Sequence, residues 1–174
     1  MIVPNAIPMP QCCCRIEYGR GVSAHVVGDY AAALRAFQAG ARRGHAPARF
    51  MLGSMYHKGE GVVKDPGEAF AQYIVSAGRG EPRAAYVLGC MYCMGDSVEE
   101  DPGQAVRWFR LSAARGFAPA QFSLGTMFSS GTDIGCDPDE AMKWFLLAAA
   151  QGHRQALCEL QAMAASKCGQ EGPQ

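Results

Sequence analysis

Long apolar runs are missing from this 174-residue sequence. No stretch approaches the roughly 18 uncharged apolar residues of a membrane-spanning helix, so we expect no membrane span. The first ten residues, MIVPNAIPMP, contain three prolines and no basic residue. This is unlike the charged start and continuous apolar core of a secretory signal. We therefore expect a soluble, cytoplasmic protein.

An excess of either charge is also missing. Sixteen Lys and Arg balance sixteen Asp and Glu, so no general affinity for nucleic acid is predicted. The distribution is uneven, because residues 1–87 contain ten basic and six acidic side chains and residues 88–174 contain six and ten. Arg43, Arg79 and Arg115 precede turn glycines, where the dipole of a helix end favours cations and explains most of the asymmetry. The rest of the charge asymmetry between the two halves favours either a polar partner or weak head-to-tail self-association.

Catalytic motifs are missing too. The sequence contains no H-E-x-x-H motif, no phosphate-binding glycine loop before a helix, and no strand to present a G-x-S-x-G nucleophile. The four histidines, His25, His45, His57 and His153, are far apart along the chain. His45 and His153 follow turn glycines at the same position of the pattern described below, which indicates a capping or surface role. We predict a protein that is not an enzyme and uses no cofactor.

The sequence does contain one pattern that occurs four times. The copies begin at alanines 36 residues apart, namely Ala48, Ala84, Ala120 and Ala156. A leucine, a glycine, an aspartate and an aromatic residue follow in register in the first three copies. These matched sets are Leu52, Leu88 and Leu124; Gly53, Gly89 and Gly125; Asp65, Asp101 and Asp137; and Tyr73, Phe109 and Phe145. Repeats of this length are units that bury their apolar faces by stacking on their neighbours.

Each of the three full copies predicts two helices. The first, residues 47–58 in the first full copy, has apolar residues at helical spacing. The second begins at an Asp-Pro pair, with Asp65 as N-cap, Pro66 as first helical residue and Glu68 as third. A turn glycine such as Gly80 ends it. The sequence therefore predicts an all-α helical repeat array with a 36-residue period.

The pattern also sets the predicted boundaries. Residues 1–28 are expected to be an irregular lead-in with a degenerate first helix, and residues 29–165 the repeat array, in a chain that is one domain by size. Residues 166–174 are expected to form a disordered tail. The array divides into a half repeat at 29–46, full repeats at 47–82, 83–118 and 119–154, and a capping helix at 155–165.

The eight cysteines are spaced irregularly along the sequence. None of the eight recurs at the repeat period, which argues against a regular disulfide framework. Cys90 and Cys93 lie at i and i+3 of a predicted helix, a spacing found in metal and redox sites. The neighbouring copies add only His57 as a further ligand, so we predict no metal site and interpret both residues as buried or groove-lining thiols. The run of three cysteines at 12–14 allows lipidation, metal binding or cross-linking. We favour the interpretation that these cysteines are simply part of the irregular lead-in.

The repeat resembles a known family. The pattern of the full copies reads A-x-F/Y-x-L-G-x-M-Y/F-x-x-G, a loop of about six residues, then D-P-x-E/Q-A-x-x-W-F/Y and A-x-x-G, with Gln72 in place of Trp in the first copy. This pattern closely resembles Sel1-like repeats, relatives of tetratricopeptide repeats, over roughly residues 29–165. The resemblance implies an α-α superhelix, or solenoid, of antiparallel helix pairs whose first helices line a concave face. It also implies that the protein is an adaptor or scaffold, and it implies no catalytic reaction.

One face of the first helix differs between copies. It lies opposite the repeated leucine and contains small hydroxyl and thiol side chains beside one aromatic residue. These side chains suit an incoming helix or extended peptide that supplies the bulk, and the aromatic residues are also expected to pack between helices. The predicted partner-binding residues are Phe50, Ser54, His57, Tyr86, Cys90, Cys93, Phe122, Thr126 and Ser129.

Two functions follow from this interpretation. The first is a protein–protein interaction scaffold or adaptor that binds a peptide or protein surface through the concave face. The alternative is a regulatory or immunity-type binder that inhibits an enzyme or toxin by covering its surface. A hydrolase or redox enzyme that uses Cys90 and Cys93 is a third class, and partners held at edges, loops or termini also remain open.

Overall fold

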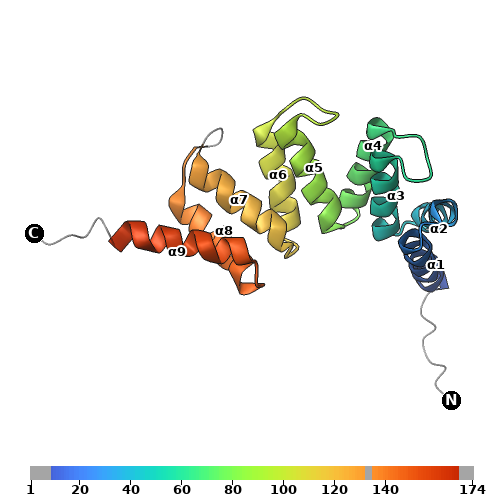
Figure 1. Cartoon of the computed structure of the whole chain (residues 1–174), viewed down its shortest axis with the longest axis horizontal. Helices are drawn as coiled ribbons and strands as arrows, with labels where there is room; N and C mark the ends of the chain where they lie inside the picture. Colours follow the sequence, from blue (N-terminus) through green and yellow to red (C-terminus); the bar gives the residue numbers. More distant parts are fainter. Residues whose placement is uncertain (1–8, 132–134, 169–174) are drawn as a thin grey trace, which may run out of the picture. The chain divides into compact units, whose positions relative to one another are not determined.

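The structure is a computed structural model that describes residues 9–131 and 135–168. Within these ranges the chain forms nine helices and no strand (Figure 1). The all-α fold class predicted from the repeat is therefore observed in every described segment.

The helices group into two compact units that divide between Ala84 and Ala85, and each unit is described by itself. Chain length alone favoured a single domain. Unit 1 contains α1 (Met9–Val26), α2 (Tyr30–Arg42), α3 (Ala46–Lys58) and α4 (Pro66–Gly78). Unit 2 contains α6 (Pro102–Ala113), α7 (Ala118–Ser130), α8 (Pro138–Ala150), α9 (Arg154–Cys168) and most of α5 (Pro82–Met94).

The predicted aspartate caps are present. The Oδ1 atoms of Asp65, Asp101 and Asp137 accept the backbone N–H three residues later at 3.0, 2.9 and 3.0 Å. The proline that follows each aspartate is the first residue of α4, α6 and α8. Asp29 caps α2 through the N–H of Ala32 at 2.9 Å. Each cap satisfies a backbone donor that the helix itself leaves without a partner.

The two histidines at the repeated turn position are caps as well. Nδ1 of His45 accepts the N–H of Ala48 at 3.2 Å. Nδ1 of His153 accepts the N–H of Ala156 at 3.4 Å. The capping role predicted from their shared position is confirmed.

A close contact between a glycine and an aromatic ring joins the helices of each full pair. A Cβ atom added at Gly53, Gly89 or Gly125 would lie 2.9, 2.6 or 2.5 Å from the ring of Tyr73, Phe109 or Phe145. All three rings are almost fully buried. Glycine normally weakens a helix by about 1 kcal/mol relative to alanine, so these glycines are explained by the space that the rings require.

The first helix pair has the same contact at a different spacing. A Cβ atom at Gly21 of α1 would lie 2.6 Å from the ring of Phe37 in α2. Here glycine and ring are 16 residues apart in the sequence, whereas they are 20 apart in the other pairs. The connection between α1 and α2 is shorter by the same amount, which moves the first helix out of the 36-residue register.

The ends of the chain therefore differ from the expected boundaries. The lead-in, expected to be irregular with a degenerate first helix, forms the continuous helix α1 from Met9 to Val26, which includes the cysteines at 12–14. At the other end α9 begins at Arg154 and continues to Cys168, three residues into the expected tail. The rest of that tail lies outside the described residues. No helix in the described ranges combines the length and the apolar character needed to cross a bilayer.

The glycine contact predicts a difference between two alanine variants in unit 1. Gly53→Ala should lower the free energy of unfolding by about 1–3 kcal/mol, because the methyl group would overlap the Tyr73 ring. Gly78→Ala is the matched control, since nothing lies within 4 Å of its Cβ position. It should leave stability unchanged or raise it by about 0.5–1 kcal/mol. Urea unfolding monitored by circular dichroism measures both values, and equal effects would contradict the contact.

Candidate functional site

The aromatic residues on the predicted binding face pack within their own helix pairs. The ring centroids of Phe50 and Tyr73 are 5.7 Å apart. Those of Tyr86 and Phe109 are 5.6 Å apart, and those of Phe122 and Phe145 are 5.7 Å apart. In each pair the ring of the second helix thus meets a glycine and an aromatic residue of the first helix, three positions apart. This is the packing role expected for these aromatic residues.

A groove with a volume of about 330 Å³ opens in unit 2, and we call it the apolar groove. The lining comes from α5, α6 and α7 and includes no charged side chain. The residues are Cys90, Cys93, Met94, Phe109, Phe122, Ser123, Thr126 and Met127. Cys90, Cys93, Phe122 and Thr126, which the sequence predicted as contact residues, therefore lie together in one groove.

The polar atoms of the groove are largely satisfied or neutral. Burial raises the pKa of the Cys90 thiol, although its hydrogen bond with Tyr86 acts in the opposite direction. Cys90 is therefore a neutral thiol near pH 7. The Thr126 hydroxyl donates to the carbonyl oxygen of Phe122 at 3.1 Å, within its own helix. Met94 keeps 69% of its surface exposed, so the groove presents a largely apolar surface to solvent.

The other predicted residues lie elsewhere. Phe50, Ser54 and His57 are half-buried on α3 of unit 1, where the Arg83 guanidinium lies 4.6 Å above the Phe50 ring. Tyr86 is directed into the packing between helices, with its ring 5.4 Å from that of Phe117, and burial raises the pKa of its hydroxyl. Ser129 is exposed on α7 beyond the groove.

The residues predicted from the sequence do not include Met94, Phe109, Ser123 or Met127, which also line the groove. Met127 occupies a position where methionine recurs at the repeat period, as Met55 and Met91. Met55 and Met91 are 0% and 2% exposed, so the recurrence indicates a core residue. Spacing could have identified Met94, which follows Cys90 by four residues on the same helix face.

The described side chains include no group of three or more His, Cys, Asp and Glu residues placed to hold a metal ion. Cys90 and Cys93 are explained by their place in the wall of the apolar groove.

The repeat of this chain matches a known protein family. A sequence profile described as the Sel1 repeat matches residues 46–71, 82–117 and 118–153, which is more than half of the chain. The chain belongs to the Sel1 repeat family. Among curated proteins, none matches the sequence significantly.

Two solved structures are similar to this Sel1 repeat chain. A Sel1 repeat protein from Oxalobacter formigenes is 33% identical with a TM-score of 0.71, over 74% of this chain and 97% of the other. The protein c5321, a protective antigen present in uropathogenic Escherichia coli strains, is 31% identical with a TM-score of 0.82 over 88% of this chain. This chain spans 34% of the length of c5321, which displays the Sel1-like repeat fold.

These similarities confirm both the predicted family and the all-α solenoid fold class. Sel1 repeat proteins are generally scaffolds for protein–protein interaction and are typically not enzymes.

The neutral state of Cys90 predicts slow alkylation. At pH 7.5 iodoacetamide should modify Cys90 in the folded protein about tenfold or more slowly than in urea, because a raised pKa leaves little thiolate. The rate should keep rising as pH increases beyond the ordinary pKa of a thiol. Peptide mass spectrometry measures the rate at each cysteine, and the exposed Cys158 serves as the internal control. Faster reaction of Cys90 in the folded state would identify an activated thiolate instead.

Proposed function

We propose that this Sel1 repeat protein is an interaction scaffold whose apolar groove binds one large apolar side chain of a peptide or protein partner. The observation that supports the proposal is the groove itself, with a volume of about 330 Å³ and no charged side chain in its lining. This volume is at the lower end of the range of ligand pockets, which suits one anchor side chain. Four contact residues predicted from the variable helix face lie in its lining.

The lining indicates which anchors fit. Met94 and Met127 form part of the wall, and unbranched methionine side chains adapt to anchors of different shape. Ser123 and Thr126 are short, so the partner backbone can approach α7 closely. Leucine, methionine or phenylalanine anchors meet these conditions. Because the groove lining is uncharged, affinity should come mainly from apolar burial and depend little on salt.

The same chemistry favours binding over catalysis. A neutral Cys90 thiol is a poor nucleophile, and the Thr126 hydroxyl is already bonded within its helix. We also propose a cytoplasmic location, where thiols such as these remain reduced. Inhibition of an enzyme or toxin by surface occlusion stays a prediction from the sequence alone.

A selection from displayed random peptides tests the proposal. Peptides selected on the wild-type protein should share a large apolar residue and bind with micromolar affinity. Thr126→Arg places a long charged side chain at the groove and should weaken binding at least about tenfold, since the guanidinium would lose hydration beside apolar walls. Ser130→Arg is the matched control, because Ser130 is exposed one turn along the same helix and does not line the groove. Fluorescence anisotropy of labelled peptides measures each affinity.

Two results would contradict this function. One is a selection that enriches no peptide, and the other is equal affinity for the wild type and Thr126→Arg. Methyl NMR of labelled methionine locates the contact, because the signals of Met94 and Met127 should move on binding. If Ser129→Arg weakened binding as strongly as Thr126→Arg, the contact face would extend past the groove along α7.

A further inference from the structure

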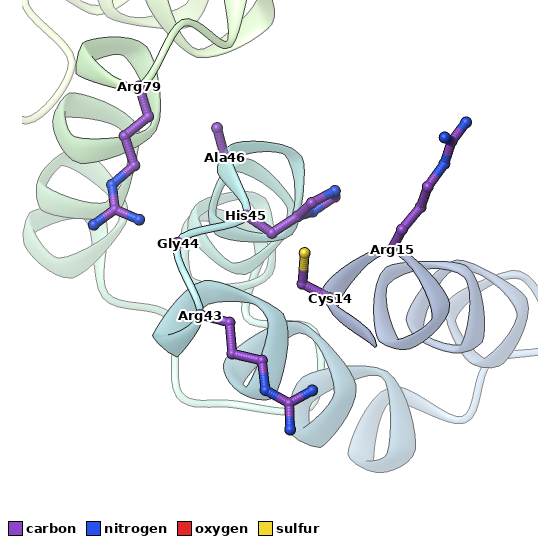
Figure 2. Close-up of a pocket in the computed structure, with 7 residues that line it drawn as sticks. All are labelled: Cys14, Arg15, Arg43, Gly44, His45, Ala46 and Arg79. Atoms are coloured by element: carbon purple, nitrogen blue, oxygen red, sulfur yellow. The ribbon is translucent and has the colours of Figure 1, made fainter. Parts of the chain in front are cut away.

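A second pocket lies in unit 1, and its lining is basic. Its volume is about 440 Å³. Residues from α1, from the turn between α2 and α3 with the start of α3, and from the end of α4 surround it. They are Cys14, Arg15, Arg43, Gly44, His45, Ala46 and Arg79 (Figure 2). We call it the basic pocket.

The three guanidinium groups are spread around the basic pocket. Figure 2 shows Arg15, Arg43 and Arg79 reaching in different directions from three separate segments, and they do not converge on one point. A single small anion therefore contacts at most part of this set. A ligand with several anionic groups along its length matches the arrangement better.

The acidic groups nearby leave two of the arginines without a counter-charge. Nη1 of Arg43 pairs with Oε1 of Glu17 at 2.8 Å. Glu81, which is 7% exposed, pairs with Nε of Arg83 at 2.6 Å. In the described part of the chain, no carboxylate pairs with Arg15 or Arg79. The basic pocket therefore has unneutralised positive charge at its surface.

The Arg79 guanidinium lies against Gly44 in the turn between α2 and α3. Gly44 has a φ of +87°, and a Cβ atom there would collide with the Arg79 guanidinium. Arg43 and Arg79 occupy equivalent repeat positions, and Arg115 is the third member of this set. At the turn after Arg115, however, Phe117 stands where the turn after Arg43 has His45, and its ring packs against that of Tyr86 at 5.4 Å. The basic pocket is therefore a feature of unit 1 that the repeat does not require.

The chain itself contains a complementary acidic segment. Residues 1–84 have ten basic and six acidic side chains, and residues 85–174 have six and ten. Three consecutive acids, Glu99, Glu100 and Asp101, are exposed in the connection between α5 and α6. In the described residues neither Glu99 nor Glu100 has a cationic partner. By contrast, Glu140 lies 3.4 Å from Lys143 and accepts from Trp144 at 3.0 Å.

We propose that the basic pocket of one copy binds the acidic loop 98–101 of a second copy, so that the protein self-associates head to tail. This contact is heterologous, because each copy contributes its basic pocket to one neighbour and its acidic loop to another. The zero net charge of the chain removes the general repulsion that would oppose it. Since the attraction is between exposed charges, it should weaken steeply with salt.

Sedimentation velocity of the purified protein tests the proposal. At roughly 50 mM salt the weight-average mass should increase with protein concentration, and at roughly 500 mM salt the protein should be monomeric. Arg15→Glu/Arg79→Glu and Glu99→Arg/Glu100→Arg should each lower the association constant at least about tenfold. Mixing these two variants should restore association, because the unchanged loop of the first variant then meets the unchanged pocket of the second, and the reversed pocket meets the reversed loop.

Matched controls have the same change of charge outside the contact. Arg20→Glu/Arg35→Glu alters exposed residues of unit 1, and Asp139→Arg/Glu159→Arg alters exposed residues of unit 2. Both should associate like the wild type, as should Thr126→Arg, whose substitution lies in the apolar groove. Thermal unfolding confirms that each variant is folded. If the pocket variant fails this check, Arg15→Gln/Arg79→Gln replaces it and should also weaken association.

Three outcomes would overturn the proposal. The first is a wild-type protein that stays monomeric at low salt over the whole concentration range. The second is association that persists in both charge-reversed variants. The third is a mixture of the two variants that remains monomeric, because complementary charges would then fail to pair.

Discussion

The contact between a helical glycine and an aromatic ring is the constraint on which the remaining structure depends. It occurs between Gly21 and Phe37 and in each later pair. Because a ring occupies the space of a missing side chain, the two helices approach closely. One face of each helix is therefore buried against the other helix of the pair. Recognition is left to the surfaces outside this contact. The apolar groove lies beside one such contact, because the Phe109 ring that packs on Gly89 also forms part of its lining, and the basic pocket lies at the turn that precedes α3.

Features that depend on a few neighbouring residues could be predicted from the sequence. The caps at Asp65, Asp101 and Asp137 and the histidine caps each involve residues three positions apart, so local pattern is sufficient. Helix α1 could be predicted by the same reasoning only as a degenerate first helix within residues 1–28. Its glycine and its partner ring keep their contact, but a shorter turn removes them from the repeat register. The basic pocket could not be predicted for a related reason. Arg15 belongs to this out-of-register helix, and it lines a pocket together with Arg79 only in the folded unit.

The apolar groove, too, could be predicted only in part from the sequence. Variation along one helix face identified Cys90 and Thr126, because a surface free of packing constraints can differ between copies. Whether an exposed position lines a groove depends on the adjacent helix, however, and the spacing of residues on α7 does not contain that information. Ser129 satisfies the pattern yet lies past the groove. Met127 follows a core pattern and nevertheless reaches it. The variable helix face could be predicted from the sequence. Which of its residues line the groove depends on how α5, α6 and α7 pack.

The histidine cap of α3 couples the start of that helix to proton concentration. Nδ1 of His45 accepts a hydrogen bond, so the cap exists only while the imidazole is neutral. Burial lowers the pKa of His45, with Glu81 opposing this effect and Arg15 adding to it. As pH falls below the ordinary histidine value of 6.5, the unfolded chain takes up a proton that the folded chain resists. Mild acid therefore reduces the free energy of unfolding through this residue, and acidification acts at the turn that also forms the basic pocket.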